Sequence, residues 1–425
     1  MQALGLNPLQ IIIPGSYYDS QIYDSKLYLW GRDSSIITLN WNKLIDNINI
    51  SNELKYVLQL SMQYGDDLYT NFLFRDPDIR KIILGKFREL EKISVEISKA
   101  DLESCIVNKQ DNPLPFPHAD STIHYKTVYV GGQSGVSASK CGYSQYDSLN
   151  SQTNKLCDVP VLSLSASNLT LAIAAGSEGL FEFSLEEKTS LKSNDLKHIS
   201  PHHSNLVRWL YPSVFSSSYF NEGYFADFKI SRKRKTRVQN NGEQKISNLL
   251  IETQIDNNGF KVPVEIDKKS KVNRKLEKLL SANSIFSSNQ DNDQLPIFTW
   301  GIKDKICLIT DNSINLVKCF PTEKNEHKKF INIGSIKSEE FTEDIVSADS
   351  SFFGIVLEKE DRLVVITSLI EYINFMGEPV NWRVFPKSRN YTNQLHIIYE
   401  DCIRIYSFNH DFFVDQGAKK IGISF

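Results

Sequence analysis

The chain repeats one local pattern, two runs of alternating apolar and polar residues joined by a tight polar or glycine-containing turn. Period-two alternation around a short turn is typical of a β-hairpin. Seven segments of this kind are spread along the 425 residues: 26–41, 127–139, 169–184, 219–230, 305–318, 352–367 and 396–409. Repetition on this scale predicts an all-β architecture assembled from similar sheets.

The spacing of the hairpins predicts how the sheets are arranged. Their turns are centred near Ser35, Gly135, Gly179, Gly223, Asn312, Asp361 and Asp401. Four of the six intervals lie near the roughly 40–45 residues that one four-stranded propeller blade occupies. The two longer intervals leave room for a blade plus an insertion. We therefore expect residues 1–425 to form a single seven-bladed β-propeller, with eight blades as one alternative and two β-sandwich domains as another. A strand near residues 9–13 would close the ring by pairing with the last blade.

In this architecture the chain resembles β-propellers of the WD40 type over nearly its whole length. The Trp-Asp dipeptide that ends many WD40 blades is absent, and Gly-His does not occur. The resemblance therefore implies the fold, and no residue-level function follows from it.

Composition and motifs argue against several classes of function. A net charge of −3 gives no overall preference for nucleic acid or an anionic membrane. No stretch approaches the roughly 18 apolar residues of a membrane span. Neither a phosphate-binding loop nor a dinucleotide fingerprint is present, and no Cys-x-x-Cys pair indicates a zinc or redox site. We expect no cofactor and no structural metal, and a cytoplasmic location, or a nuclear one in a eukaryote.

Residues 42–104 interrupt the β pattern with helical periodicity. A helix is expected to begin at Asp76 as the cap, with Pro77 in its first position. Its expected apolar stripe consists of Ile79, Ile82, Ile83, Phe87, Leu90 and Ile93. This helical insertion would either cap the propeller or bind a partner protein. The polar candidates for partner binding are Arg80, Arg88, Glu91 and Lys92.

Residues 231–295 form a second break, which is basic at its start. The basic block contains Arg232, Lys233, Arg234, Lys235 and Arg237. A hairpin-like stretch at 249–266, which could make an eighth blade, precedes a basic run at 268–281 with helical spacing. The basic residues could contact phosphates or an acidic protein, or form a solvated loop without a specific role.

Two further clusters have a functional and a structural interpretation. His198, His202 and His203 are weak candidates for metal ligands, and Pro201 favours an ordinary loop instead. Residues 380–414 are rich in aromatic side chains, which suit either the core between sheets or a recognition surface.

These observations favour a non-enzymatic scaffold, a subunit of a multiprotein complex that binds a partner through the propeller face and the two insertions. The first alternative is an enzyme or small-ligand receptor with its site in the central channel. That alternative requires carboxylates, histidines or arginines that converge at the blade ends, and the sequence alone does not identify such a set. The second alternative is a nucleic-acid-associated protein that uses the basic clusters at 232–278.

Overall fold

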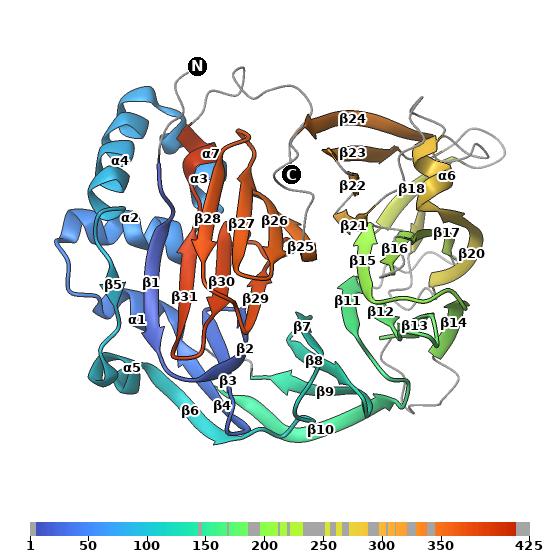
Figure 1. Ribbon diagram of the computed structural model, residues 1–425, viewed down its shortest axis with the longest axis horizontal. Helices are drawn as coiled ribbons and strands as arrows, with labels where there is room; N and C mark the ends of the chain where they lie inside the picture. Colours follow the sequence, from blue (N-terminus) through green and yellow to red (C-terminus); the bar gives the residue numbers. More distant parts are fainter. Residues whose placement is uncertain are drawn as a thin grey trace.

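The structure, a computed structural model, describes residues 6–142, 147–167, 170–185, 196–210, 213–218, 222–232, 251–255, 261–265, 272–287, 297–302, 305–310, 312–320, 329–337 and 345–413. Seven of its sheets, each containing four antiparallel strands, are arranged in a ring around a central axis (Figure 1). The protein is thus a seven-bladed β-propeller, as the hairpin spacing predicts.

The first three blades each contain four strands. Blade 1 consists of β2 (Tyr17–Tyr23), β3 (Lys26–Gly31), β4 (Ser35–Asn40) and β6 (Ile106–Asp111). Blade 2 consists of β7 (Asp120–His124), β8 (Thr127–Gly132), β9 (Gly135–Cys141) and β10 (Leu149–Cys157). Blade 3 consists of β11 (Ser163–Ser167), β12 (Thr170–Ala174), β13 (Leu180–Ser184) and β14 (Leu196–Ser200).

The next three blades follow the same order. Blade 4 consists of β15 (Leu206–Leu210), β16 (Ser213–Ser217), β17 (Gly223–Arg232) and β20 (Val272–Ser281). Blade 5 consists of β21 (Phe298–Ile302), β22 (Lys305–Thr310), β23 (Ser313–Phe320) and β24 (Lys329–Lys337). Blade 6 consists of β25 (Ile345–Ser351), β26 (Gly354–Lys359), β27 (Arg362–Thr367) and β28 (Tyr372–Met376). In each blade the first strand lies innermost (Figure 1). The predicted hairpin supplies the second and third strands except in blade 4, where the predicted segment 219–230 begins after β16 and contains only β17.

Blade 7 joins the two ends of the chain. Its strands are β29 (Asn381–Val384), β30 (Gln394–Ile398), β31 (Cys402–Ser407) and β1 (Leu9–Pro14). β1 pairs antiparallel with β31 from Leu9 opposite Ser407 to Pro14 opposite Cys402. The predicted closure by an amino-terminal strand is confirmed, and this pairing covers an edge that would otherwise be exposed.

Two of the hairpin turns require a glycine. Gly135 and Gly179 stand at the start of the third strand in blades 2 and 3, with φ of +99° and +98°. A Cβ atom at Gly135 would lie 2.0 Å from the Cys157 carbonyl oxygen, and one at Gly179 would lie 2.1 Å from that of Ser200. The outer strand therefore approaches so closely that only glycine fits either position.

The basic run at 268–281 is not helical where the structure describes it, so this prediction is wrong. Residues 272–281 form β20, the outer strand of blade 4. The register against β17 shifts between Asp227 and Phe228, so that Glu277 is skipped in the pairing of the two strands. A bulge of this kind places Leu276 and Leu279 on one face, where both pack on the same core cluster. Helical spacing in the sequence thus arises from a bulged strand.

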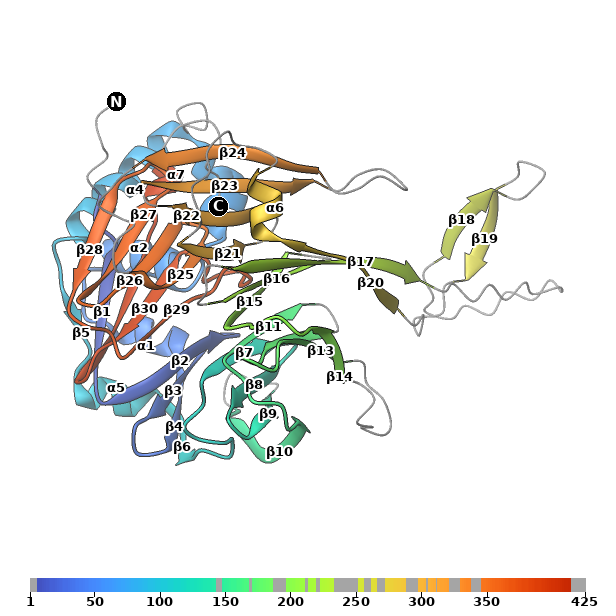
Figure 2. The ribbon, with the colours of Figure 1, turned by 45° about the vertical axis from the view of Figure 1, so that its right-hand side comes forward.

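The hairpin expected near 249–266 exists, but it is not an eighth blade. β18 (Ile251–Ile255) and β19 (Lys261–Glu265) pair only with each other, and Figure 2 shows them to one side of the ring. The short helix α6 (Ala282–Ser287) follows β20, and α7 (His410–Phe413) follows β31.

The helical insertion lies between β4 and β6. It contains α1 (Trp41–Asn47), α2 (Asn52–Met62), α3 (Asp67–Thr70), the 3₁₀ helix η1 (Phe72–Arg75), α4 (Pro77–Leu90), β5 (Val95–Glu96) and α5 (Lys99–Cys105). The predicted start of α4 is confirmed, since the Asp76 side chain accepts hydrogen bonds from the backbone of Asp78 and Ile79.

The insertion packs against the ring beside blades 7 and 1. Ile83, Phe87 and Leu90 of α4 share one core cluster with residues of β1, β3 and β31. β5 pairs in parallel with β1, so β1 lies between β31 of blade 7 and β5 of the insertion. The predicted stripe is too wide, because Ile82 and Ile93 are exposed.

Candidate functional site

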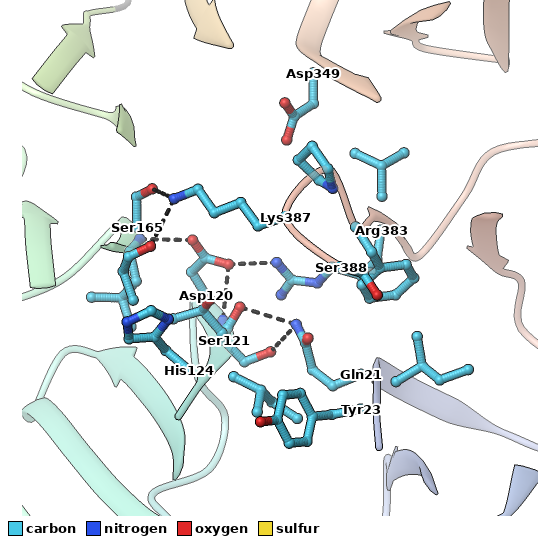
Figure 3. Close-up of a pocket in the computed structure, with 18 of the residues that line it drawn as sticks. Gln21, Tyr23, Asp120, Ser121, His124, Ser165, Asp349, Arg383, Lys387 and Ser388 are labelled. Atoms are coloured by element: carbon cyan, nitrogen blue, oxygen red, sulfur yellow. Dashed lines mark hydrogen bonds and ion pairs between the residues drawn. The ribbon is translucent and has the colours of Figure 1, made fainter. Parts of the chain in front are cut away.

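A cavity of about 940 Å³ lies within the ring, where the innermost strands meet. It is lined by residues of β2, β7, β11, β15 and β25, and by β29 with the loop that follows it (Figure 3). This volume is in the range of small-ligand sites. Charged side chains from several blades line this cavity, among them Asp120, Arg208 and Arg383. The sequence alone did not identify them as a set.

Asp19 is the centre of one cluster. Its carboxylate is fully buried and accepts hydrogen bonds from Arg383 Nε at 2.8 Å and from Arg383 Nη2 at 2.9 Å. His118 Nε2 lies 2.8 Å from its Oδ2, and the Ser121 hydroxyl donates to the same oxygen at 2.6 Å. Burial alone would raise the pKa of Asp19, but Arg383 and His118 hold it well below its usual range.

Arg383 connects this cluster to the next blade. Its Nη1 donates to Asp120 Oδ1, so one guanidinium from blade 7 binds carboxylates of blades 1 and 2. Burial would lower the pKa of Arg383, but Asp19 and Asp120 raise it above its ordinary value. Asp120 Oδ2 in turn accepts from the Leu164 backbone at 2.7 Å and from the Ser163 hydroxyl at 3.1 Å in blade 3.

A second ion pair spans blades 4 and 6. Arg208 Nη2 lies 2.6 Å from Asp349 Oδ2, and Arg208 Nη1 donates to the Ser163 hydroxyl at 3.3 Å. In blade 5, Trp300 Nε1 donates to Ser350 Oγ of blade 6 at 2.9 Å. Polar contacts near the axis therefore reach all seven blades.

The carboxylates of this network share a local geometry. In Asp19-Ser20, Asp120-Ser121 and Asp349-Ser350, the aspartate Oδ1 accepts the backbone N–H of the following serine at 2.8 Å. All three pairs lie on the innermost strand of a blade. Recurrence of Asp-Ser ahead of a hairpin was the sequence signal that could have found them. The dipeptide also occurs elsewhere, as at Asp147-Ser148, so position relative to the hairpin is needed to recognise it.

Lys387 differs from the other cations of the cavity. It lies in the loop between β29 and β30, and its Nζ donates to the Ala166 carbonyl at 2.7 Å and to Ser165 Oγ at 3.2 Å, both in blade 3 (Figure 3). No carboxylate among the described residues is within ion-pair distance of it. Surrounding protein and the nearby Arg208 lower the pKa of Lys387, while Asp349 opposes that change. The residue is also exposed to the cavity, and water moderates the effect.

Most of the cavity's charged groups already have protein partners. His396 of β30 does not line the cavity: it is fully buried, its Nδ1 lies 3.1 Å from Ser20 Oγ, and burial lowers its pKa to about 3. A neutral His396 and paired carboxylates are suited to holding strands together. Within the described part of the chain, no group of three or more histidine, cysteine or acidic residues could hold a metal ion.

The predicted partner-binding residues of the insertion have different environments. Arg80 donates to the Phe412 carbonyl and lies over the Phe412 ring, 5.2 Å from its centroid, which ties α4 to α7. Glu91 accepts the backbone N–H of Asn7 at 2.8 Å. Arg88 and Lys92 are exposed.

The other predicted site residues are not brought together with the insertion. Arg232 ends β17, whereas Lys233, Arg234, Lys235 and Arg237 lie outside the described residues. His198 lies in β14, the ring of His202 stacks on Tyr224 at 3.9 Å, and His203 Nδ1 lies 3.3 Å from Ser218 Oγ. The aromatic stretch 380–414 is largely core, since Phe385, Tyr391, Tyr406 and Phe408 are buried.

No protein-family model matches the chain, and no curated protein sequence matches it. Among solved structures, the computationally designed Ika8 protein is similar at 7% identity, covering 95% of this chain and all of its own, with a TM-score of 0.42. The WD40 β-propeller domain of Doa1 is similar at 10% identity, covering 70% of this chain and 95% of its own, with a TM-score of 0.33. The blade assignment rests on the strand pairing described above. None of the helices in the described ranges has the length and apolar character needed to cross a membrane.

Proposed function

We propose that this protein is a non-enzymatic interaction scaffold, a subunit of a protein complex, and that its helical insertion binds the partner protein. β-Propellers commonly mediate protein interactions. The observation that carries the proposal is the concentration of exposed apolar side chains on the insertion. Six of the thirteen large apolar residues exposed in the described chain lie there: Tyr56, Tyr64, Phe72, Leu73, Ile82 and Ile93.

Two of these residues lie next to one ion pair. Lys86 Nζ of α4 lies 2.7 Å from Glu53 Oε2 of α2. Tyr56 is three residues after Glu53 and Ile82 is four residues before Lys86, so each is a neighbour of the pair on its own helix. Tyr56 is 69% exposed and Ile82 is 65% exposed. We call Tyr56 and Ile82 the insertion patch.

The ring does not require the insertion patch for its own packing. α2 and α4 already bury Val57, Leu58, Ile83 and Phe87 in the core cluster shared with blades 1 and 7. A second apolar face on the same two helices is then available for an external partner. Aromatic and aliphatic anchors beside charges, here Glu53 and Lys86, are typical of the energetic centre and rim of a protein interface.

The test is affinity purification from the native source, comparing wild type with Tyr56→Ser/Ile82→Ser. A protein that co-purifies in stoichiometric amount should be lost from this variant, with an affinity loss of roughly tenfold or more. The matched control is Tyr372→Ser/Met376→Ser, an exposed aromatic-aliphatic pair on β28 of blade 6. Equal capture by both variants would contradict the insertion as the binding surface.

A further inference from the structure

The loop that follows β29 crosses the cavity from blade 7 to blade 3. It carries Lys387, whose amine contacts Ser165 and Ala166 on β11. Farther along the loop, the Tyr391 hydroxyl accepts the backbone N–H of Ser25 in blade 1 at 3.2 Å. The loop is thereby fixed at two points, and Lys387 is held at the cavity wall.

Two cations are attached to the same strand. Ser163 accepts from Arg208, and Ser165 accepts from Lys387. Ser163 and Ser165 are alternate residues of β11, so their side chains lie on one face, roughly 7 Å apart along the strand. Backbone N–H groups of β15 also donate to both hydroxyls, Val207 to Ser163 and Trp209 to Ser165. The two cation-binding hydroxyls are therefore fixed in position by the ring itself.

Unlike the two arginines of this wall, Lys387 has no carboxylate within ion-pair distance among the described residues. Arg208 is neutralised by Asp349, with 2.6 Å between Nη2 and Oδ2. The hydrogen-bond partners of Lys387, the Ser165 hydroxyl and the Ala166 carbonyl, are both neutral. The other arginine of the wall, Arg383, has two carboxylates. When Lys387 is protonated, its ammonium group faces the cavity with hydrogen-bond partners but no ion pair among the described residues, so an anion that enters the cavity can become its partner.

From this juxtaposition we infer that the cavity binds a small organic anion, whose carboxylate or phosphate group lies between Lys387 and Arg208. Lysine ammonium and serine hydroxyl groups are common ligands of both oxyanions. A cavity of about 940 Å³ has room for the remainder of such a molecule. This site is separate from the insertion patch and does not depend on the scaffold function.

The experiment measures binding of two probes, succinate and inorganic phosphate, to the full chain by titration calorimetry at constant ionic strength. Sodium chloride serves as the ionic blank, and succinamide is the neutral analogue of succinate. We expect saturable binding of at least one anion at one site per chain, and none of succinamide. Preference for phosphate would indicate a phosphorylated ligand, and preference for succinate would indicate a dicarboxylate.

Three variants locate the site. Lys387→Met keeps most of the side-chain bulk without the charge and should weaken binding at least tenfold. Ser165→Ala removes the hydroxyl that holds the amine and should weaken it several-fold. Arg389→Gln is the matched control, because Arg389 also lines the cavity but is highly exposed and lies 3.4 Å from Asp66. Its affinity should stay within twofold of wild type.

Two results would overturn the inference. One is the absence of saturable binding of either anion to the folded wild-type protein. The other is binding by Lys387→Met with the wild-type affinity, provided that circular dichroism shows the variant folded.

Discussion

The wall of the central channel buries charged side chains, whereas the outer face of the helical insertion exposes apolar ones. In the channel, Asp19, Asp120 and Arg383 are enclosed by protein and bound to one another. On the insertion, Tyr56 and Ile82 remain in water although apolar burial elsewhere in the same helices is extensive. Buried charges that are fully paired are needed by the fold, because removing one partner leaves an uncompensated charge. Exposed apolar side chains contribute little to the stability of the chain, and this is the basis on which we propose the insertion patch as a binding surface.

Deletion of residues 1–14 should have the largest effect, because β1 joins the ring to the insertion. It pairs with β31 of blade 7 on one side and with β5 of the insertion on the other. Leu9, Ile11 and Ile13 are buried, and loss of their burial amounts to roughly 4.5–9 kcal/mol at about 1.5–3 kcal/mol each. We expect aggregation or a large loss of stability, measured by size-exclusion chromatography and thermal unfolding.

Limited proteolysis of the same truncation would sharpen the comparison between the regions. Cleavage in the insertion and in blade 7 at the same temperature would show that the two depend on the same strand. A soluble truncation that is as heat-stable as the full chain would reject closure of the ring by β1.

Asp19→Ala should have the next largest effect. It leaves Arg383 buried with one carboxylate instead of two, and it removes the partner of His118. Breaking a buried ion pair costs about 3–5 kcal/mol of unfolding free energy, measurable by urea denaturation. Asp361→Ala, which removes an exposed carboxylate of the β26–β27 turn, should change stability by less than about 0.5 kcal/mol. Similar values for the two variants would mean that the channel cluster does not hold the ring.

The pH dependence of stability gives an independent measure of the same cluster. The pKa of Asp19 is lowered in the folded protein, so its ionised form contributes stability above its unfolded pKa of about 3.9. That contribution is lost as pH falls below this value toward the folded pKa. The difference in urea midpoint between wild type and Asp19→Asn should be constant from about pH 7 to 5 and shrink below about pH 4. A difference that is independent of pH would indicate that shape rather than charge matters at this position.

The hairpins and the channel also differ in how far the sequence predicts them. A hairpin is local, so its alternation and turn residues are visible in one short stretch, as at β8 and β9 around Gly135. The channel contacts join residues that are far apart, such as Asp19 with Arg383, and they exist only once the ring is closed. No local pattern could pair these residues, although the recurring Asp-Ser step marked one half of the set.

β20 shows a second reason for failure. Its Leu276 and Leu279 have the spacing of a helix face, but a bulge opposite β17 changes the phase of the strand. A bulge depends on the partner strand, which the sequence of β20 does not contain. The sequence predicts the insertion because a capped helix is also a local signal. It does not predict that Ile82 is exposed, because that depends on which face of α4 packs against the ring.

Charge reversal on the insertion should affect binding more than folding. Arg88→Glu/Lys92→Glu changes two exposed residues, and it leaves Glu91 with its contact to Asn7. Unfolding free energy should change by less than about 0.5 kcal/mol. Association with the partner should slow several-fold, with a difference that shrinks as salt rises, because rim charges act mainly on the encounter rate. Surface plasmon resonance against the captured partner measures both quantities, and unchanged association at low salt would restrict the interface to the insertion patch.

Among the channel variants, Lys387→Met should change stability least, and it should raise stability rather than lower it. The folded protein lowers the pKa of Lys387 through enclosure and Arg208, with Asp349 acting against both. Below the folded pKa, holding this charge costs stability; the cost falls as pH rises toward the unfolded pKa of about 10.4, where both states become neutral. Because Lys387 is exposed to the cavity, the variant should gain no more than about 1 kcal/mol at neutral pH. The gain should vanish near pH 10, as measured by thermal unfolding across that range. A variant less stable than wild type at neutral pH would show that the bonds to Ser165 and Ala166 outweigh the cost of the charge, and Lys387 would then belong with Arg383 among the residues that hold the ring together.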